Sequence, residues 1–106
     1  MPTYNKLVRD KIPEIIAANG ERCTYKTLDD AAYKNELRRK LLEEVNEYLE
    51  ATTDKDAAEE LADITEMIHA LAELHGKSFA DVEVIRQKKR AERGGFKEKL
   101  FLIDAD

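Results

Sequence analysis

Glu43-Glu44-Val45-Asn46-Glu47 and Glu59-Glu60-Leu61-Ala62-Asp63 are two acidic stretches in which carboxylates recur three residues apart. Positions i and i+3 of an α-helix lie on the same side, about 5–6 Å apart at Cβ. Residues 52–55 form a short break between the stretches, which predicts two helices that fold back antiparallel. Four carboxylates are then expected to converge on one place, namely those of Glu44, Glu47, Glu60 and Asp63.

The position of these acids relative to the apolar face of each helix indicates which of them point inward. With about 100° of rotation per residue, the apolar residues of the first helix span roughly 0° to 140° from Leu37. Glu44 falls beside this arc at about −20°, and Glu47 flanks it at about −80°. Measured from its first alanine, the second helix has an apolar arc from roughly −100° to +60°. Glu60 lies inside that arc at about −60°, and Asp63 borders it at about −120°.

The other acids of the two helices are expected to face water, as surface glutamates usually do. They are Glu43, Glu50, Glu59, Glu66 and Glu73. The inward acids need a counter-charge, because an ionised carboxylate in an apolar stripe is costly unless it is paired or bound to a cation.

A divalent ion is one possible source of that counter-charge, since it removes the mutual repulsion of converging carboxylates. An ion-pair network is the alternative, and Lys40, at about −60° on the first helix, is its obvious candidate. The geometry favours the metal site. A set of oxygen ligands suits Mg²⁺, with Mn²⁺ as a second possibility, and argues against zinc.

Composition limits the class of protein. The 106 residues suit one small domain, residues 1–106. With 42% hydrophobic and 39% charged residues, the chain is expected to be soluble and globular, and its net charge of −5 argues against nucleic-acid binding. No apolar run approaches membrane-spanning length, and the N-terminus lacks a signal-peptide pattern. The single Cys23 cannot form an internal disulfide, so we expect a reducing, cytoplasmic location.

The order of elements predicts an all-α fold, an antiparallel helical bundle. The two shorter helices are expected from Pro13, with Asp10 as its cap, to Asn19-Gly20, and from the capping pair Ser78 and Asp81 to Arg93. The two long ones are expected over residues 31–51 behind Asp29 and Asp30, and from the capping pair Asp56 and Glu59 to just before Gly76.

Residues 21–28 alternate in character and are the best strand candidate in the chain. A lone strand cannot satisfy its backbone hydrogen bonds. We therefore predict that residues 99–103 pair with this segment, giving a small two-stranded β element that joins the N- and C-terminal regions.

The second half of the last predicted helix is basic and carries Arg86, Lys88, Lys89, Arg90 and Arg93. Cations favour a helix C-terminus, so a solvated, well-capped end is one interpretation. A phosphate-binding patch is the other, with Gly94-Gly95 permitting close backbone approach and Phe96 offering a face to a base. An acidic metal cluster together with a separate basic patch is what phosphoanhydride chemistry requires.

Glu-Glu-x-x-Glu at 43–47, followed by Glu-x-x-Asp at 60–63, resembles the MazG-type all-α nucleoside triphosphate pyrophosphohydrolases. The opening Tyr-Asn-Lys-Leu-Val-Arg-Asp-Lys-Ile-Pro at 4–13 and the closing Arg-Gly-Gly-Phe at 93–96 resemble a compact subgroup described as house-cleaning enzymes for noncanonical nucleotides. The resemblance spans nearly the whole chain. It implies Mg²⁺ binding by the four acids, cleavage between the α- and β-phosphates to a nucleoside monophosphate and pyrophosphate, and assembly into dimers or tetramers.

The resemblance and the helical positions select the same four acids. Glu44, Glu60 and Asp63 are the predicted direct metal ligands, and Glu47 is either a fourth ligand or the base that orients the attacking water. The predicted substrate-binding residues are Lys6, Arg9, Lys11, Lys89, Arg90, Arg93 and Phe96. His69 and His75 are assigned no catalytic role.

Two other functions stay open. Relatives that hydrolyse phosphoribosyl-ATP in histidine biosynthesis share the bundle and the acidic motifs. A non-enzymatic helical partner or regulator, with its acids held by lysine or arginine, is the second alternative. We also expect a homodimer or higher homo-oligomer, because the apolar arcs of the two long helices exceed what one short helix covers.

Overall fold

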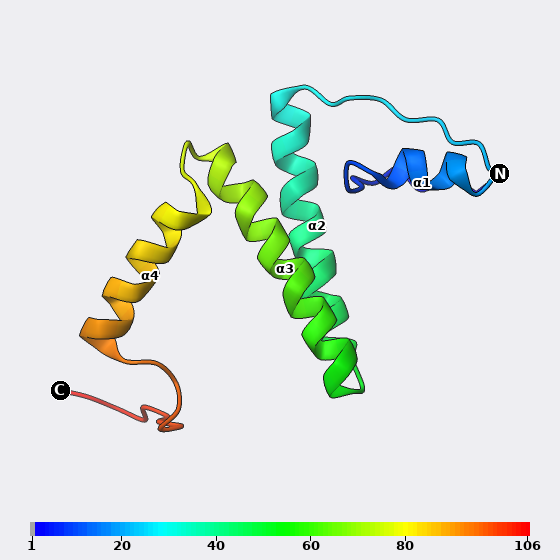
Figure 1. Ribbon diagram of the computed structural model, residues 1–106. Helices are drawn as coiled ribbons and strands as arrows, with labels where there is room; N and C mark the ends of the chain where they lie inside the picture. Colours follow the sequence, from blue (N-terminus) through cyan, green and yellow to red (C-terminus); the bar gives the residue numbers. More distant parts are fainter. Residues whose placement is uncertain (1) are drawn as a thin grey trace.

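The computed structural model describes residues 2–106, which form four α-helices and no β-strand (Figure 1). The helices are α1 (Ile12–Ala18), α2 (Asp30–Glu50), α3 (Asp54–Leu74) and α4 (Phe79–Arg93). The prediction of an all-α fold is therefore confirmed. Within the described residues, no helix combines the length and the apolar character that a bilayer-spanning segment needs.

Two of the predicted caps form as expected. The Asp29 carboxylate accepts a hydrogen bond from the backbone N–H of Ala32 at 2.8 Å and so begins α2. At the start of α4, Ser78 and Asp81 form a reciprocal capping box, in which each side chain accepts a hydrogen bond from the other residue's backbone N–H. Such side-chain caps each stabilise a helix by about 1 kcal/mol, because they satisfy otherwise unpaired donors.

The two other predicted caps are wrong. The hydroxyl of Thr53, rather than Asp56, caps α3 by accepting from the Asp56 N–H at 3.1 Å, so the helix already begins at Asp54. Thr53 lies in extended backbone, as an N-cap residue requires, whereas Asp56 is inside the first turn. At α1 the N-cap position belongs to Lys11, which makes no side-chain cap, and Asp10 lies outside it.

Helices α2 and α3 pack antiparallel along their length as a hairpin joined by residues 51–53, and α4 contacts only the C-terminal part of α3 among the described helices (Figure 1). Among the described residues, the buried apolar side chains are those of Leu37, Met67 and Ala72. All three belong to the half of the hairpin away from the α2–α3 turn. The core is therefore small and lies between α2 and α3.

The fold is open for its length. The radius of gyration is 18.1 Å, whereas a compact chain of this size has about 13 Å. The accessible surface is 9689 Å², against about 6,000 Å² for a compact monomer of this mass. Large apolar side chains such as Leu49, Leu61 and Phe101 are exposed. The described chain forms a helical hairpin with a flanking helix, and the finer prediction of an antiparallel bundle of all the helices is not confirmed.

The predicted two-stranded β element is not confirmed either. Residues 21–28 and 99–103 form no β-ladder in the described chain, and Figure 1 places them on opposite sides of the α2–α3 hairpin. Alternating side-chain character predicts an extended segment, but a β-ladder also needs a neighbouring strand within about 5 Å. With helices between the two segments, the chain does not bring that partner close.

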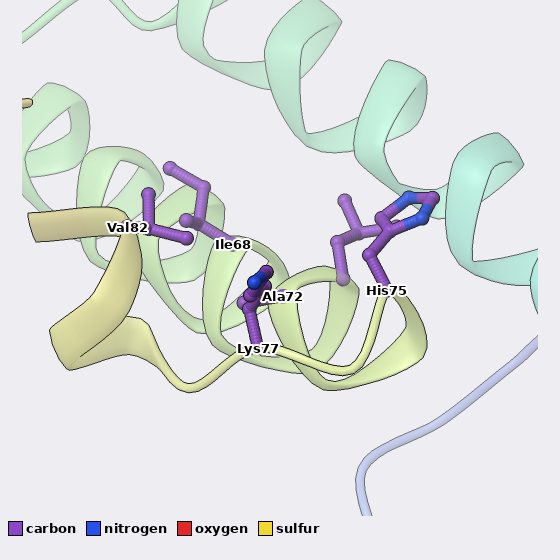
Figure 2. Close-up of a pocket in the computed structure, with 6 residues that line it drawn as sticks. Ile68, Ala72, His75, Lys77 and Val82 are labelled. Atoms are coloured by element: carbon purple, nitrogen blue, oxygen red, sulfur yellow. The ribbon is translucent and has the colours of Figure 1, made fainter. Parts of the chain in front are cut away.

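An apolar groove lies at the elbow between α3 and α4 (Figure 2). Its volume is about 290 Å³. Its walls come from the end of α3, the α3–α4 loop and α4, and the lining residues are Ile68, Leu71, Ala72, His75, Lys77 and Val82. Beside it the ring of His69 stacks on that of Phe79, with centroids 3.9 Å apart and planes within 3°. The two predicted non-catalytic histidines therefore lie at this elbow, away from the acidic residues.

Candidate metal centre

Three of the four predicted ligands converge. Glu44 lies in the second half of α2, and Glu60 and Asp63 lie in the first half of α3, so the antiparallel hairpin brings them to the same level. One carboxylate oxygen from each lies within 4.8 Å of the others. The ligand oxygens of an octahedral Mg²⁺ are at most about 4.2 Å apart, twice the Mg–O distance. Small side-chain movements are therefore enough to bring the three oxygens around one ion.

Two oxygens of this trio are buried and unpaired. Glu44 is only 6% exposed, and its Oε2 atom has no hydrogen-bond partner among residues 2–106. The Oε2 atom of Glu60 is also buried and also lacks a hydrogen-bond partner within the described chain. A buried carboxylate oxygen without a partner is costly, and protein interiors rarely leave one. A hard cation satisfies such oxygens, so the donor set fits Mg²⁺ or Mn²⁺.

The other oxygen of Glu44 is paired. Lys40 Nζ lies 3.5 Å from Glu44 Oε1, one turn earlier on the same helix. The ion pair that the sequence offered as an alternative counter-charge is therefore present. It neutralises one oxygen of Glu44 and leaves the second one free.

Desolvation and the neighbouring carboxylates together raise the pKa of Glu60 to about 7. The largest cause is desolvation by burial, followed by hydrogen bonding of the protonated group with Glu44 and Glu47 and by the negative charge of both. The pKa of Glu47 is also raised, first by desolvation and then by the charge of Glu44. A pKa of about 7 means that the Glu60 carboxyl is partly protonated near neutral pH, and a bound divalent ion would displace that proton.

Glu47 lies on the solvent side of the trio. It is exposed and belongs to a second, overlapping acid group with Glu43 and Glu44. Its carboxylate also contributes to the raised pKa of Glu60. An exposed position suits the role of a base that orients water, and it suits the role of a buried metal ligand less well.

Glu43 is a residue that sequence reasoning missed. The helical positions assign it to the solvated face, but it is half-buried and lies 3.8 Å from Lys6 Nζ. The covering segment comes from the N-terminus, so rotation about the α2 axis alone could not reveal it. The signal available in the sequence was the cluster of cations at residues 6–11 ahead of an acidic pair.

Two of the predicted substrate-binding cations reach the acids. Arg9 Nη2 donates to Asp63 Oδ1 at 2.7 Å, and Lys6 pairs with Glu43 and also lies 5.9 Å from the centre of the Tyr4 ring. The N-terminal segment of residues 4–9 therefore contacts the rim of the cluster. Lys11 lies two residues further on, is exposed, and forms no ion pair within the described chain.

The predicted C-terminal contacts are elsewhere. The second half of α4 extends away from the α2–α3 hairpin (Figure 1), and within the described chain α4 does not contact α2. The predicted contact residues are Lys89, Arg90, Arg93 and Phe96, all exposed. The chain therefore brings together the acids and the N-terminal cations, but not the C-terminal ones.

Comparison with known proteins gives one partial match. A protein of Mycolicibacterium smegmatis, described as an uncharacterized protein, is 49% identical over 53 residues. These residues are 50% of this chain and 53% of the relative, so the chain spans about half of that relative's length. No protein-family model matches the chain, and no solved structure does. The relative's description names no activity, so the geometry of the acids carries the functional argument.

Proposed function

We propose that this chain is a MazG-type, Mg²⁺-dependent nucleoside triphosphate pyrophosphohydrolase. It would cleave the bond between the α- and β-phosphates and release a nucleoside monophosphate and pyrophosphate, with noncanonical nucleotides as substrates. The observation that carries the proposal is the trio of carboxylate oxygens from Glu44, Glu60 and Asp63 within 4.8 Å, one of them on a nearly buried residue with an unpaired oxygen. Mn²⁺ is the alternative ion.

Bound Mg²⁺ supplies charge neutralisation of the polyphosphate and lowers the pKa of a water molecule. Glu44, Glu60 and Asp63 would hold the ion, and the exposed carboxylate of Glu47 would accept the proton of the attacking water. Partial desolvation and the charge of Glu44 raise the pKa of Glu47 above its usual value, which makes it a stronger base. The oxygen of water would bond to either the α- or the β-phosphorus as the bond from that phosphorus to the bridging oxygen breaks, so that a nucleoside monophosphate and pyrophosphate separate. Lys6 and Arg9 then neutralise the phosphate charge from the rim.

We further propose that the active form is a homodimer or a higher homo-oligomer. The accessible surface of 9689 Å² exceeds that of a compact monomer by about 3,600 Å², which is the scale of obligate interfaces. Exposed apolar side chains and the elbow groove offer surface for such contacts. In an assembly, the basic end of α4 from one copy is available to the acid cluster of another. We place the reaction in the cytoplasm, where the exposed Cys23 stays reduced.

A non-enzymatic helical partner or regulator is the second candidate, and one set of observations favours it. Three acids of the cluster are already paired with cations, Glu43 with Lys6, Glu44 with Lys40 and Asp63 with Arg9. Phosphoribosyl-ATP hydrolysis is a variant of the first candidate, since it uses the same bond cleavage at the same kind of site.

A substrate panel separates these candidates. The purified full chain is incubated with canonical and noncanonical nucleoside triphosphates and with phosphoribosyl-ATP, with Mg²⁺ or with a chelator, and pyrophosphate release is measured. The proposal predicts release that requires Mg²⁺ and is fastest with a noncanonical nucleotide. Preference for phosphoribosyl-ATP would favour phosphoribosyl-ATP hydrolysis as the function. Absence of pyrophosphate release from every substrate would favour the non-enzymatic partner or regulator.

A further inference from the structure

The N-terminal segment places a permanent positive charge directly on one of the proposed metal ligands. We propose that Arg9 is a built-in competitor of the metal ion: its guanidinium neutralises Asp63 in the metal-free protein, leaves when a divalent cation binds, and then holds the substrate phosphate. This inference rests on the proposed function and adds a regulatory step to the same site.

The contact between Arg9 and Asp63 is short, but both side chains are largely exposed to water. Arg9 Nη2 and Asp63 Oδ1 are 2.7 Å apart, although the residues are 54 positions apart in the sequence. This distance is that of a charge-assisted hydrogen bond, about 2.7–2.9 Å. The side chains are 56% and 39% exposed, and ion pairs this open to water contribute little to stability. The pair is therefore well formed but easily exchanged.

Arg9 and a divalent cation are expected to exclude each other. Asp63 is one of the three residues whose oxygens lie within 4.8 Å of one another, so an ion held by the trio would lie next to the guanidinium. Two positive groups a few ångströms apart repel each other, and the repulsion is stronger at a partly buried site than in water. Binding of the ion therefore favours departure of Arg9.

Lys40 is a cation that cannot leave in the same way. It is attached to the same rigid helix as Glu44, one turn away, and neutralises only Oε1. Arg9 instead belongs to a segment that precedes α1, and α1 packs against none of the other three helices. Apart from the half-buried Leu7, the segment is held to the hairpin by the ion pairs of Lys6 and Arg9. The segment can therefore shift without disturbing the core.

The released guanidinium is well suited to the second role. Its planar fork matches the oxygens of a phosphate, with which it forms two parallel hydrogen bonds. Because it starts at the rim of the metal cluster, it is near the place where a metal-bound polyphosphate would lie. Arg9 would then leave Asp63 when the metal binds and hold the phosphate of the nucleotide that binds next.

The test is the affinity for Mn²⁺ in the absence of nucleotide, measured by isothermal titration calorimetry on the full chain. Arg9→Gln is expected to bind Mn²⁺ at least about 5-fold more tightly than the wild type, because the competitor is gone. Arg38→Gln is the matched control, since it removes the same charge from an exposed site on α2 that has no acidic partner within the described chain. It is expected to change the Kd by less than about 2-fold.

Two further measurements sharpen the result. Tryptic cleavage after Lys6 or Arg9 in the wild type is expected to accelerate when Mn²⁺ is added, because the segment is released. Arg9→Gln is also expected to raise the KM for the nucleoside triphosphate about tenfold or more, despite binding the metal better. Arg9→Lys, which keeps the charge and loses the fork, serves if Arg9→Gln proves poorly folded, and it should show the KM defect without the full gain in Mn²⁺ affinity.

Equal or weaker Mn²⁺ binding by Arg9→Gln overturns the inference while leaving the proposed function intact. Absence of Mn²⁺ binding in the wild type and in both variants overturns the inference together with the proposed metal site. The two failures are thus distinguishable by whether the wild type binds the ion.

Discussion

The two halves of the α2–α3 hairpin do opposite things. The half away from the turn buries the apolar side chains of Leu37, Met67 and Ala72. The half near the turn buries Glu44 and leaves oxygens of Glu44 and Glu60 unpaired. Apolar burial stabilises a fold, whereas crowded carboxylates oppose it unless a cation is bound. One half therefore holds the helices together, and the other uses part of that stability to keep the crowded carboxylates in place.

The largest expected effect is on activity and falls on the acidic half. Glu60→Gln is expected to reduce Mg²⁺-dependent pyrophosphate release more than about 100-fold, since even outer partners of metal ligands account for 10- to 100-fold. Its folding stability without metal should be unchanged or higher, because one source of repulsion is removed. Glu59→Gln, an exposed acid next to it in sequence, is the control and should retain activity. Equal activity of the Glu60 and Glu59 variants would refute the site.

The apolar half should show the reverse, a loss of stability. Leu37 is 2% exposed, so Leu37→Ala is expected to lower the free energy of unfolding by about 2–5 kcal/mol through lost contacts and a cavity. Urea denaturation monitored by circular dichroism measures the change. Leu42→Ala, on an exposed side chain of the same helix, should cost less than about 0.5 kcal/mol. Similar losses for both variants would mean that Leu37 is not part of the core.

The pH dependence of stability separates the halves further. The Glu60 carboxyl has a pKa of about 7 in the folded chain, above its ordinary value of 4.5. The folded state therefore binds more protons than the unfolded state between these values, and stability falls as pH rises in this range. In the presence of a chelator, the Tm should be highest below about pH 4.5 with respect to this group and decline through pH 7. Glu60→Gln should flatten this decline, and an unchanged profile would contradict the raised pKa.

The smallest effect expected is that of a helix cap at the acidic end. Thr53→Ala removes the side chain that accepts from the Asp56 N–H and should cost about 1 kcal/mol. Thr52→Ala changes an exposed neighbour of the same type and should be near neutral. If both threonines behave alike, the start of α3 is not fixed by this cap.

The sequence was sufficient for the helices and for the trio of acids, because both follow from periodicity. Leu37 and Met67 lie on the apolar arcs and are buried, and Glu44, close to the first arc, is buried with them. Rotation about a helix axis is a local property, so it can be determined from spacing alone. Caps are less certain, because several polar residues near one helix end compete, as Thr53 and Asp56 do at α3.

Features that depend on long-range approach could not be derived in this way. The pairing of Arg9 with Asp63 joins residues 54 positions apart. The direction in which the basic end of α4 points depends on the angle between α3 and α4. The expected β element is absent from the described chain for the same reason. Alternation predicts an extended segment but does not identify the segment that pairs with it. Local rules therefore predicted the converging acids and not the residues that cover them.

The most direct test of the central claim is the thermal response to Mg²⁺ of the wild type, Glu60→Gln and Glu59→Gln. Binding at 100 times the Kd stabilises a folded protein by about 2.7 kcal/mol. We expect Mg²⁺ to raise the Tm of the wild type and of Glu59→Gln by several degrees, and to leave that of Glu60→Gln unchanged. No shift in the wild type, or the same shift in all three proteins, would contradict a divalent metal centre at Glu44, Glu60 and Asp63.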